Sequence, residues 1–178
     1  MSLAPETPTP GRRDLLKAGA GVVAAALPQL ASAHDCSPAS MPTGAAAVTG
    51  RSHWAIKKVP GQDIRLYMWN KRLTQSATPP KATVLLVHGS SVSSTPVYDL
   101  TVPGRDDASL MDWLARLGYD VWCFDCEGYG RSDKSRPVTA DVAMGADDLE
   151  VVSAAILNLT GAKKLMLYGS SSGALRAA

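Results

Sequence analysis

The sequence has few aromatic residues and little net charge, and each shortage excludes a class of function. Aromatic residues make up 6% of the 178-residue chain, which is too little for a platform on which nucleic-acid bases stack. The 18 Lys and Arg against 16 Asp and Glu leave a net charge of +2, without the basic excess that nucleic-acid binding requires. Charged residues amount to 19% and hydrophobic residues to 46%, which excludes a disordered polyelectrolyte and allows a buried core. We therefore expect a globular domain that binds no nucleic acid.

The chain also lacks an N-terminal hydrophobic run long enough to cross a bilayer. Its apolar stretch, residues 18–27, would rise about 15 Å as a helix, about half the thickness of a bilayer core. The stretch lies between the basic pair Arg12-Arg13 and the small residues Ala31-Ser32-Ala33, which is the order of a cleavable signal peptide. The paired arginines followed by two leucines resemble a bacterial twin-arginine signal. An ordinary general-secretion signal is the alternative.

We therefore predict a signal peptide over residues 1–33, recognised by the twin-arginine export machinery, and a periplasmic or secreted protein. Residues 34–51 are rich in Ala, Ser, Pro, Gly and Thr, and we expect them to form a flexible leader. Cys36 follows Asp35, at a position where a lipoprotein needs a small residue. We therefore expect no stable membrane anchor.

Cysteine is scarce as well, with three residues in the chain. Export favours disulfides, but three cysteines cannot all pair internally. Cys123 and Cys126 have the C-x-x-C spacing of a redox dithiol, so a periplasmic thiol redox protein is one alternative. That motif works at a helix N-terminus, which lowers the thiol pKa, whereas Cys123 lies in an apolar run and is better interpreted as a buried small side chain. No second pair of ligands stands at a suitable spacing, and we predict no metal and no cofactor.

Strand patterns begin at Ser52 and precede the first helix pattern. Apolar and polar residues alternate on both sides of a turn at Pro60-Gly61, which predicts a hairpin that is polar on one face. The apolar residues of this alternation are Trp54, Ile56, Ile64, Leu66 and Met68. The run 82–87 is apolar without alternation, as in a parallel strand covered on both faces. Two further apolar strands are expected at 119–124 and 164–168.

Two helix patterns separate these later strands. Residues 110–117 and 149–159 carry apolar side chains at helical spacing, and the helices are expected to end at Gly118 and Gly161. Strands that alternate with helices of this length indicate an α/β domain with right-handed crossovers. We predict one such domain over 52–178, with a mostly parallel sheet preceded by the antiparallel hairpin.

The last apolar run leads into Gly169-Ser170-Ser171-Ser172-Gly173, a G-x-S-x-G pattern before an alanine-rich helix start. The glycines Gly169 and Gly173 permit a sharp strand-to-helix turn that exposes the Ser171 hydroxyl above the sheet. The helix that follows places unsatisfied N–H groups and a positive dipole end beside this hydroxyl. We predict Ser171 as a nucleophile and the N–H of Ser172 as a donor to a developing oxyanion.

The run 82–87 ends in His88-Gly89-Ser90. Gly89 lets the loop backbone approach the nucleophile, so that the N–H of Ser90 can point at the same oxyanion. We expect His88 to hold this loop in shape rather than to act as the catalytic base. Chemistry in such sheets gathers at the carboxyl ends of the strands.

A third loop, 125–132, follows the strand expected at 119–124. Its Gly128-Tyr129-Gly130 allows a phosphate-binding interpretation, but no third glycine follows at the right spacing and no helix begins at once. We expect a tight structural loop stapled by Asp125 and Arg131.

Three segments together, V-L-L-V-H-G, G-Y-D-V-W-C-F-D-C-E-G-Y-G-R-S and L-Y-G-S-S-S-G, resemble the α/β-hydrolase superfamily in order and spacing over residues 52–178. The resemblance implies a serine hydrolase with Ser171 as nucleophile and Ser90 and Ser172 as oxyanion-hole residues. The implied substrate is a small acyl compound, namely an ester, lipid, thioester or amide. A serine at 171, where epoxide- and haloalkane-hydrolysing relatives have aspartate, favours acyl transfer. Ser170 and Ser172 replace the His and the Met or Gln that are commoner around the nucleophile.

In this fold the triad acid and histidine follow the nucleophile in sequence. Only Ser172–Ala178 follow Ser171 here, while His34, His53 and His88 all precede it. We therefore expect the chain to be the N-terminal part of a longer protein whose remainder supplies both residues. Without that remainder, the apolar strand 164–168 would have a bare edge. A catalytically silent hydrolase fold that binds a ligand or partner is the alternative.

Overall fold

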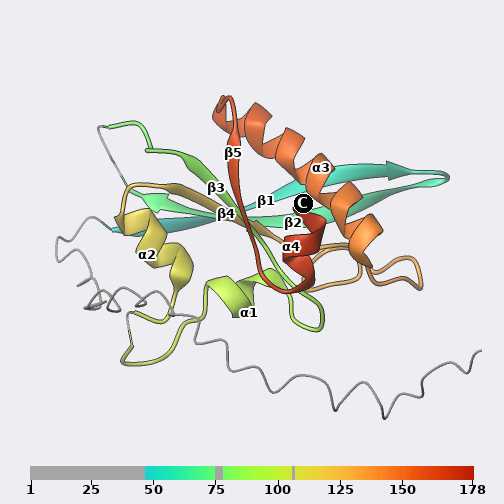
Figure 1. The fold of residues 1–178 in the computed structure, drawn as a ribbon, viewed down its shortest axis with the longest axis horizontal. Helices are drawn as coiled ribbons and strands as arrows, with labels where there is room; N and C mark the ends of the chain where they lie inside the picture. The colour runs from blue at the N-terminus through green and yellow to red at the C-terminus, as the bar shows by residue number, and fades with distance from the viewer. Residues whose placement is uncertain (1–46, 75–77, 106) are drawn as a thin grey trace, which may run out of the picture. The chain divides into compact units, whose positions relative to one another are not determined.

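The computed structural model of the protein describes residues 47–74, 78–105 and 107–178 (Figure 1). All of them belong to the unit of residues 40–178. The predicted signal peptide 1–33 and Cys36 lie outside the described residues. In chain order the elements are β1 (Val48–Val59), β2 (Gln62–Leu73), β3 (Thr83–Val87), α1 (Ser94–Tyr98), α2 (Leu110–Arg116), β4 (Asp120–Phe124), α3 (Val142–Thr160), β5 (Leu165–Gly169) and α4 (Ser172–Arg176). None of the described helices combines the length and apolar character needed to cross a membrane.

The described strands form one sheet with the order β1-β2-β4-β3-β5. β1 pairs with β2, and β2 with β4, in antiparallel register. β3 lies between β4 and β5 and pairs with both in parallel. This confirms the predicted α/β sheet, with a parallel core preceded by an antiparallel hairpin.

The hairpin begins earlier than the sequence pattern indicates. β1 already pairs at Val48 with Leu73, so residues 48–51 belong to the sheet and not to the predicted leader 34–51. The predicted turn at Pro60-Gly61 is confirmed, and Gly61 has a φ of 84°, which favours glycine.

The buried face of β1 differs from the one that its apolar residues indicate. Trp54 and Ile56 are each 45% exposed, whereas Ala55 and Lys57 are buried. Lys57 is tolerated there because its Nζ donates to Asp148 of α3 at 2.6 Å, and a buried charge requires such a partner. Trp54 packs on the outer face, where the Arg65 guanidinium lies 5.2 Å from its ring centroid.

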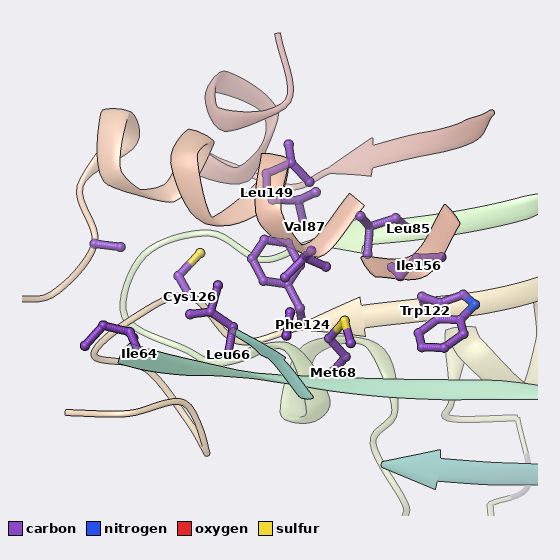
Figure 2. Packing of buried hydrophobic residues seen from close by; sticks show 13 residues of the cluster. Ile64, Leu66, Met68, Leu85, Val87, Trp122, Phe124, Cys126, Leu149 and Ile156 are labelled. Atoms are coloured by element: carbon purple, nitrogen blue, oxygen red, sulfur yellow. The ribbon is translucent and has the colours of Figure 1, made fainter. Parts of the chain in front are cut away.

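Helices cover both faces of the sheet, and each face has its own apolar core (Figure 1). Below α3, Leu149 and Ile156 pack against Leu85, Phe124 and other strand residues (Figure 2). On the opposite face, Met111 of α2 packs in a second cluster of buried residues that also contains Tyr98, Val84, Leu86, Val121 and Cys123. The strands β3 and β4 are buried along their whole length, as the unalternating run 82–87 predicts.

The helix boundaries follow local capping chemistry. Asp141 caps α3 by accepting the N–H of Met144 at 2.8 Å, and Gly161 ends the helix with a φ of 69°. Ser109 caps α2 in the same way, and Gly118, with a φ of 91°, follows its end. Both predicted stop glycines are therefore confirmed.

β5 is an edge strand of the described sheet. Met166, Leu167 and Tyr168 are 51%, 45% and 53% exposed, although the strand is as apolar as β3. The bare apolar edge expected for 164–168 is therefore present among the described residues.

Candidate active site

The register of the parallel strands brings the predicted motifs to one edge of the sheet. Val87 of β3 pairs with Phe124 of β4 and with Gly169 of β5, so the three strands end at the same level. The segments that follow each strand therefore emerge side by side. These segments are the three loops that the sequence singles out.

Ser171 occupies a strained turn between β5 and α4. Its φ of 55° and ψ of −128° lie where side chains other than glycine are rarely found. Ser171 stands at the N-cap of α4, yet its side chain makes no capping hydrogen bond, and the residue is exposed. The hydroxyl is therefore presented to solvent beside the N-terminus of α4.

The turn requires glycine at positions 169 and 173, because backbone atoms pack directly against both of these residues. A Cβ added at Gly169 would lie 2.4 Å from the carbonyl oxygen of Gly173. A Cβ added at Gly173 would lie 2.2 Å from the carbonyl oxygen of Val87. No side chain fits at either distance, so the turn packs directly on itself and on the end of β3.

The loop after β3 lies against Ser171. A Cβ added at Gly89 would be 2.9 Å from the Cβ of Ser171 and 3.4 Å from its Oγ. The hydroxyl oxygens of Ser90 and Ser172 are 2.9 Å apart. The structure thus brings together Ser171 and the two residues whose N–H groups are the predicted oxyanion donors.

His88 is completely buried, and both of its ring nitrogens contact backbone groups. Its Nε2 accepts the N–H of Cys126 at 3.1 Å, so Nδ1 carries the proton that is donated to the carbonyl oxygen of Gly89 at 2.6 Å. Burial lowers the pKa of His88 below its ordinary value, which keeps the ring neutral. In this position His88 links the loop after β3 to the loop after β4, and neither nitrogen is free to take a proton from Ser171.

The loop after β4 is held by one buried carboxylate. Asp125 accepts the N–H of Arg131 at 2.9 Å, and the N–H and hydroxyl of Ser94 at 2.8 and 2.6 Å. Gly130, with a φ of 47°, leaves no room for a Cβ, which would lie 2.0 Å from Asp125 Oδ2. The Asp125–Arg131 staple is therefore present, and it uses the backbone of Arg131. The guanidinium of Arg131 donates instead to the hydroxyl of Tyr67.

Cys123 and Cys126 are free, buried thiols. Burial raises the pKa of both to about 12, whereas a redox dithiol requires a lowered pKa. This contradicts the thiol redox alternative. Among the described residues, no group of three or more His, Cys, Asp or Glu side chains could hold a metal ion.

His53, the other described histidine, lies at the amino ends of the parallel strands, at the opposite end of the sheet from Ser171. His53 of β1 lines a hollow of about 1020 Å³ together with Lys81, Asp120 and Lys164, at the amino ends of β3, β4 and β5. Its ring packs on Trp122 with the centroids 4.8 Å apart. Neither described histidine is therefore placed as a base for Ser171, and His34 lies outside the described part of the chain.

Two residues that support the carboxyl ends of the strands, where Ser171 lies, could not be identified from the sequence pattern. Tyr98 of the unpredicted helix α1 is buried, and its hydroxyl donates to the carbonyl oxygen of Val87 at 2.7 Å. Ser91 has a positive φ of 74°, next to the residue predicted as an oxyanion donor. Helix α1 has five residues, too few for helical periodicity to be recognised.

Known structures share this architecture. A protein from Thermoplasma acidophilum that is described as a predicted CIB-like hydrolase is 22% identical, with a TM-score of 0.50 over 74% of this chain and 55% of its own. The esterase Pf2001 from Pyrococcus furiosus is 19% identical, with a TM-score of 0.53 over 72% of this chain and 44% of its own. A probable hydrolytic enzyme from Pseudomonas aeruginosa is 21% identical, with a TM-score of 0.52 over 71% of this chain and 35% of its own. The chain thus spans about a third to just over half of the length of these proteins, and the similarity shows the fold.

No curated protein matches the sequence. The family model described as serine aminopeptidase, S33, matches residues 78–178. This match covers more than half of the chain and includes all three loops at the carboxyl edge of the sheet. Together with the α/β sheet and the serine turn after β5, here defined as residues 169–173, it shows that the chain belongs to the S33 serine aminopeptidase family of α/β hydrolases.

Proposed function

We propose that the full-length protein is a serine hydrolase that acts on carboxylic esters or related acyl compounds, with Ser171 as its nucleophile. One observation carries the proposal. Ser171 has a strained φ of 55°, its hydroxyl makes no capping bond, and the glycine of the loop after β3 lies directly against it. Strained backbone conformations of this kind cluster at active sites and ligand clamps.

In the proposed mechanism, Ser171 Oγ attacks the acyl carbon, and the carbonyl oxygen acquires negative charge. The N–H groups of Ser90 and Ser172 bind this oxyanion, each contributing about 2.7–4 kcal/mol of transition-state stabilisation. The base takes the proton of Ser171 Oγ and returns it to the leaving alcohol as the tetrahedral intermediate collapses. This leaves an acyl-serine, which water then hydrolyses to the free acid and Ser171. In this mechanism the base and its orienting acid come from outside the described residues, because His53 lies at the amino ends of the strands and both ring nitrogens of His88 contact backbone groups.

The test uses the purified full-length protein with p-nitrophenyl acetate and butyrate. We expect hydrolysis that falls by about a thousandfold or more in Ser171→Ala, while Ser170→Ala, at the neighbouring position, keeps most of the activity. An aminoacyl p-nitroanilide assayed in parallel distinguishes an esterase from an aminopeptidase. If neither substrate is cleaved at a rate that depends on Ser171, the proposal is wrong, and a ligand-binding hydrolase fold becomes the better interpretation.

We further propose that the protein is exported by the twin-arginine machinery and acts in the periplasm or outside the cell. The support is the order of Arg12-Arg13, the apolar stretch 18–27 and Ala31-Ser32-Ala33. Replacing both arginines with lysine should leave the protein in the cytoplasmic fraction of a bacterial host. Unchanged export of the double variant would favour the general-secretion alternative.

A further inference from the structure

Arg176, the last residue of α4, is a buried arginine that forms an ion pair with no described carboxylate. It is 3% exposed, and its guanidinium donates to three backbone carbonyl oxygens. The partners are His88 (2.9 Å), Ala140 (2.9 Å) and Asp141 (3.3 Å). A charge taken out of water is costly to bury, so this side chain is expected to have a role that an apolar residue could not fill.

The three carbonyls belong to segments far apart in the sequence that meet at the candidate site. The carbonyl of His88 is part of the peptide bond to Gly89, the residue that packs against Ser171. Those of Ala140 and Asp141 lie just before α3. Arg176 therefore ties the helix that follows Ser171 to the oxyanion loop, here defined as residues 88–91, and to the start of α3.

Neighbouring hydrogen bonds leave this peptide bond little freedom. The carbonyl of Val87 accepts the hydroxyl of Tyr98 at 2.7 Å and the N–H of Ser170 at 3.2 Å. The carbonyl of Gly89 contacts the ring of His88 at 2.6 Å. The carbonyl of His88, which lies between these two in the chain, accepts from Arg176. Three consecutive carbonyls at the end of β3 therefore have fixed partners.

The path of the Arg176 side chain is also fixed by α3. A Cβ added at Gly145 would lie 2.4 Å from Arg176 Nε and 2.5 Å from its Cδ. The guanidinium carbon lies 5.8 Å from the ring centroid of Tyr129. The guanidinium is thus confined to one place, and any side chain at 145 would displace it.

We propose that Arg176 is a positioning residue, which holds the oxyanion loop at the distance from Ser171 that transition-state binding requires. The proposal rests on the proposed hydrolase function. A small displacement of groups that bind the transition state costs up to about 100-fold in rate. Loss of the guanidinium therefore affects kcat more than KM.

The experiment compares Arg176→Met and Arg176→Lys with the full-length wild-type protein. With p-nitrophenyl butyrate we expect kcat to fall about 10- to 100-fold in Arg176→Met, with KM within about twofold. Arg176→Lys keeps the positive charge and one donor nitrogen, and should retain more of kcat than Arg176→Met. Leu175→Ala, at an exposed position of the same helix, is the control and should change neither constant.

Gly145→Ala tests the same contact from the other side. It should lower kcat in the same direction, because its Cβ displaces the guanidinium. In an Arg176→Ala background, which lacks the Cγ, Cδ and Nε atoms that the new Cβ would meet, the same substitution should have little further effect. Additive losses would contradict a shared mechanism.

Amide hydrogen exchange tests whether Arg176 holds the oxyanion loop in place, independently of any measurement of activity. The N–H of Cys126 donates to His88 Nε2, so its exchange should accelerate in Arg176→Met while the β1–β2 hairpin keeps wild-type exchange. A folded Arg176→Met protein with wild-type kcat and wild-type exchange at Cys126 overturns the positioning role. A wild-type protein that does not cleave the ester overturns the proposed function, and exchange at Cys126 then still decides the role of Arg176.

Discussion

β4 and β5 are both five-residue strands with apolar sequences, yet the described fold buries one and exposes the other. Every residue of β4 is buried, whereas no residue of β5 is. Nevertheless, the turn that follows β5 is tight: carbonyl oxygens lie 2.4 and 2.2 Å from the Cβ positions of Gly169 and Gly173. The contacts that hold Ser171 in place are therefore those of its turn and of the adjoining end of β3, and not the burial of the strand that carries it.

The strongest way to break this arrangement is to separate the turn from β3. In Gly173→Ala the new Cβ would lie 2.2 Å from the carbonyl oxygen of Val87, so the turn must move. We expect labelling of the full-length protein by a fluorophosphonate to fall at least about 100-fold, with a loss of about 1–3 kcal/mol in the free energy of unfolding.

Gly161→Ala is the matched control. Gly161 has a φ of 69° with no atom near its Cβ position, so the substitution adds strain of about 1–2 kcal/mol without touching the site. Wild-type labelling is expected. If Gly173→Ala also labelled like wild type, the closeness of the turn would not matter for the site.

β3 is buried along its whole length like β4, so truncating one leucine in β3 and one in β5 tests the same difference in burial. Leu85 of β3 is completely buried, and Leu167 of β5 is 45% exposed. In the 178-residue chain, Leu85→Ala should lower the free energy of unfolding by about 2–5 kcal/mol, and Leu167→Ala by less than about 1 kcal/mol. Urea denaturation measures both. Equal losses would mean that β5 is covered and would contradict the difference between the strands.

A smaller effect is expected in the pH dependence of stability. Burial lowers the pKa of His88 in the folded protein, so the unfolded chain binds its proton more readily. The contribution of neutral His88 is therefore present above its ordinary pKa of about 6.5 and is lost as the pH falls below that value. Denaturation midpoints between pH 7.5 and 5 should fall less steeply in His88→Gln than in wild type.

His53→Gln provides the control for the pH series. The pKa of His53 is also lowered, first by burial and then by Arg51, but this residue is only half-buried. Its replacement should change the slope less than His88→Gln does. An unchanged slope in His88→Gln would show that His88 is not held neutral by the fold.

The apolar runs and the glycines were sufficient to predict most of the fold. Unalternating strands, helical spacing and the stop residues Gly118 and Gly161 depend on local chemistry that is visible in the sequence. The same holds for the serine turn, because its glycines are needed at fixed positions around Ser171. That the predicted site residues meet at the carboxyl ends of the strands could therefore be predicted from these local patterns alone.

What the sequence does not reveal are the polar residues that the fold buries. Lys57 has the appearance of a solvent-exposed residue in an alternating strand, and Asp148 that of one in an amphipathic helix, yet they form a buried ion pair. Arg176 likewise resembles an ordinary surface residue at a helix end. The burial of each depends on partners that are distant in sequence, and local periodicity contains no information about them.

The proposed hydrolase function requires that Ser171, rather than one of the serines around it, is the nucleophile. The most direct measurement is to react the full-length protein with a fluorophosphonate and to locate the adduct by peptide mass spectrometry. We expect a single phosphonylated residue, Ser171, and no adduct in Ser171→Ala. An adduct on Ser90, Ser170 or Ser172, or labelling that persists in Ser171→Ala, would contradict it.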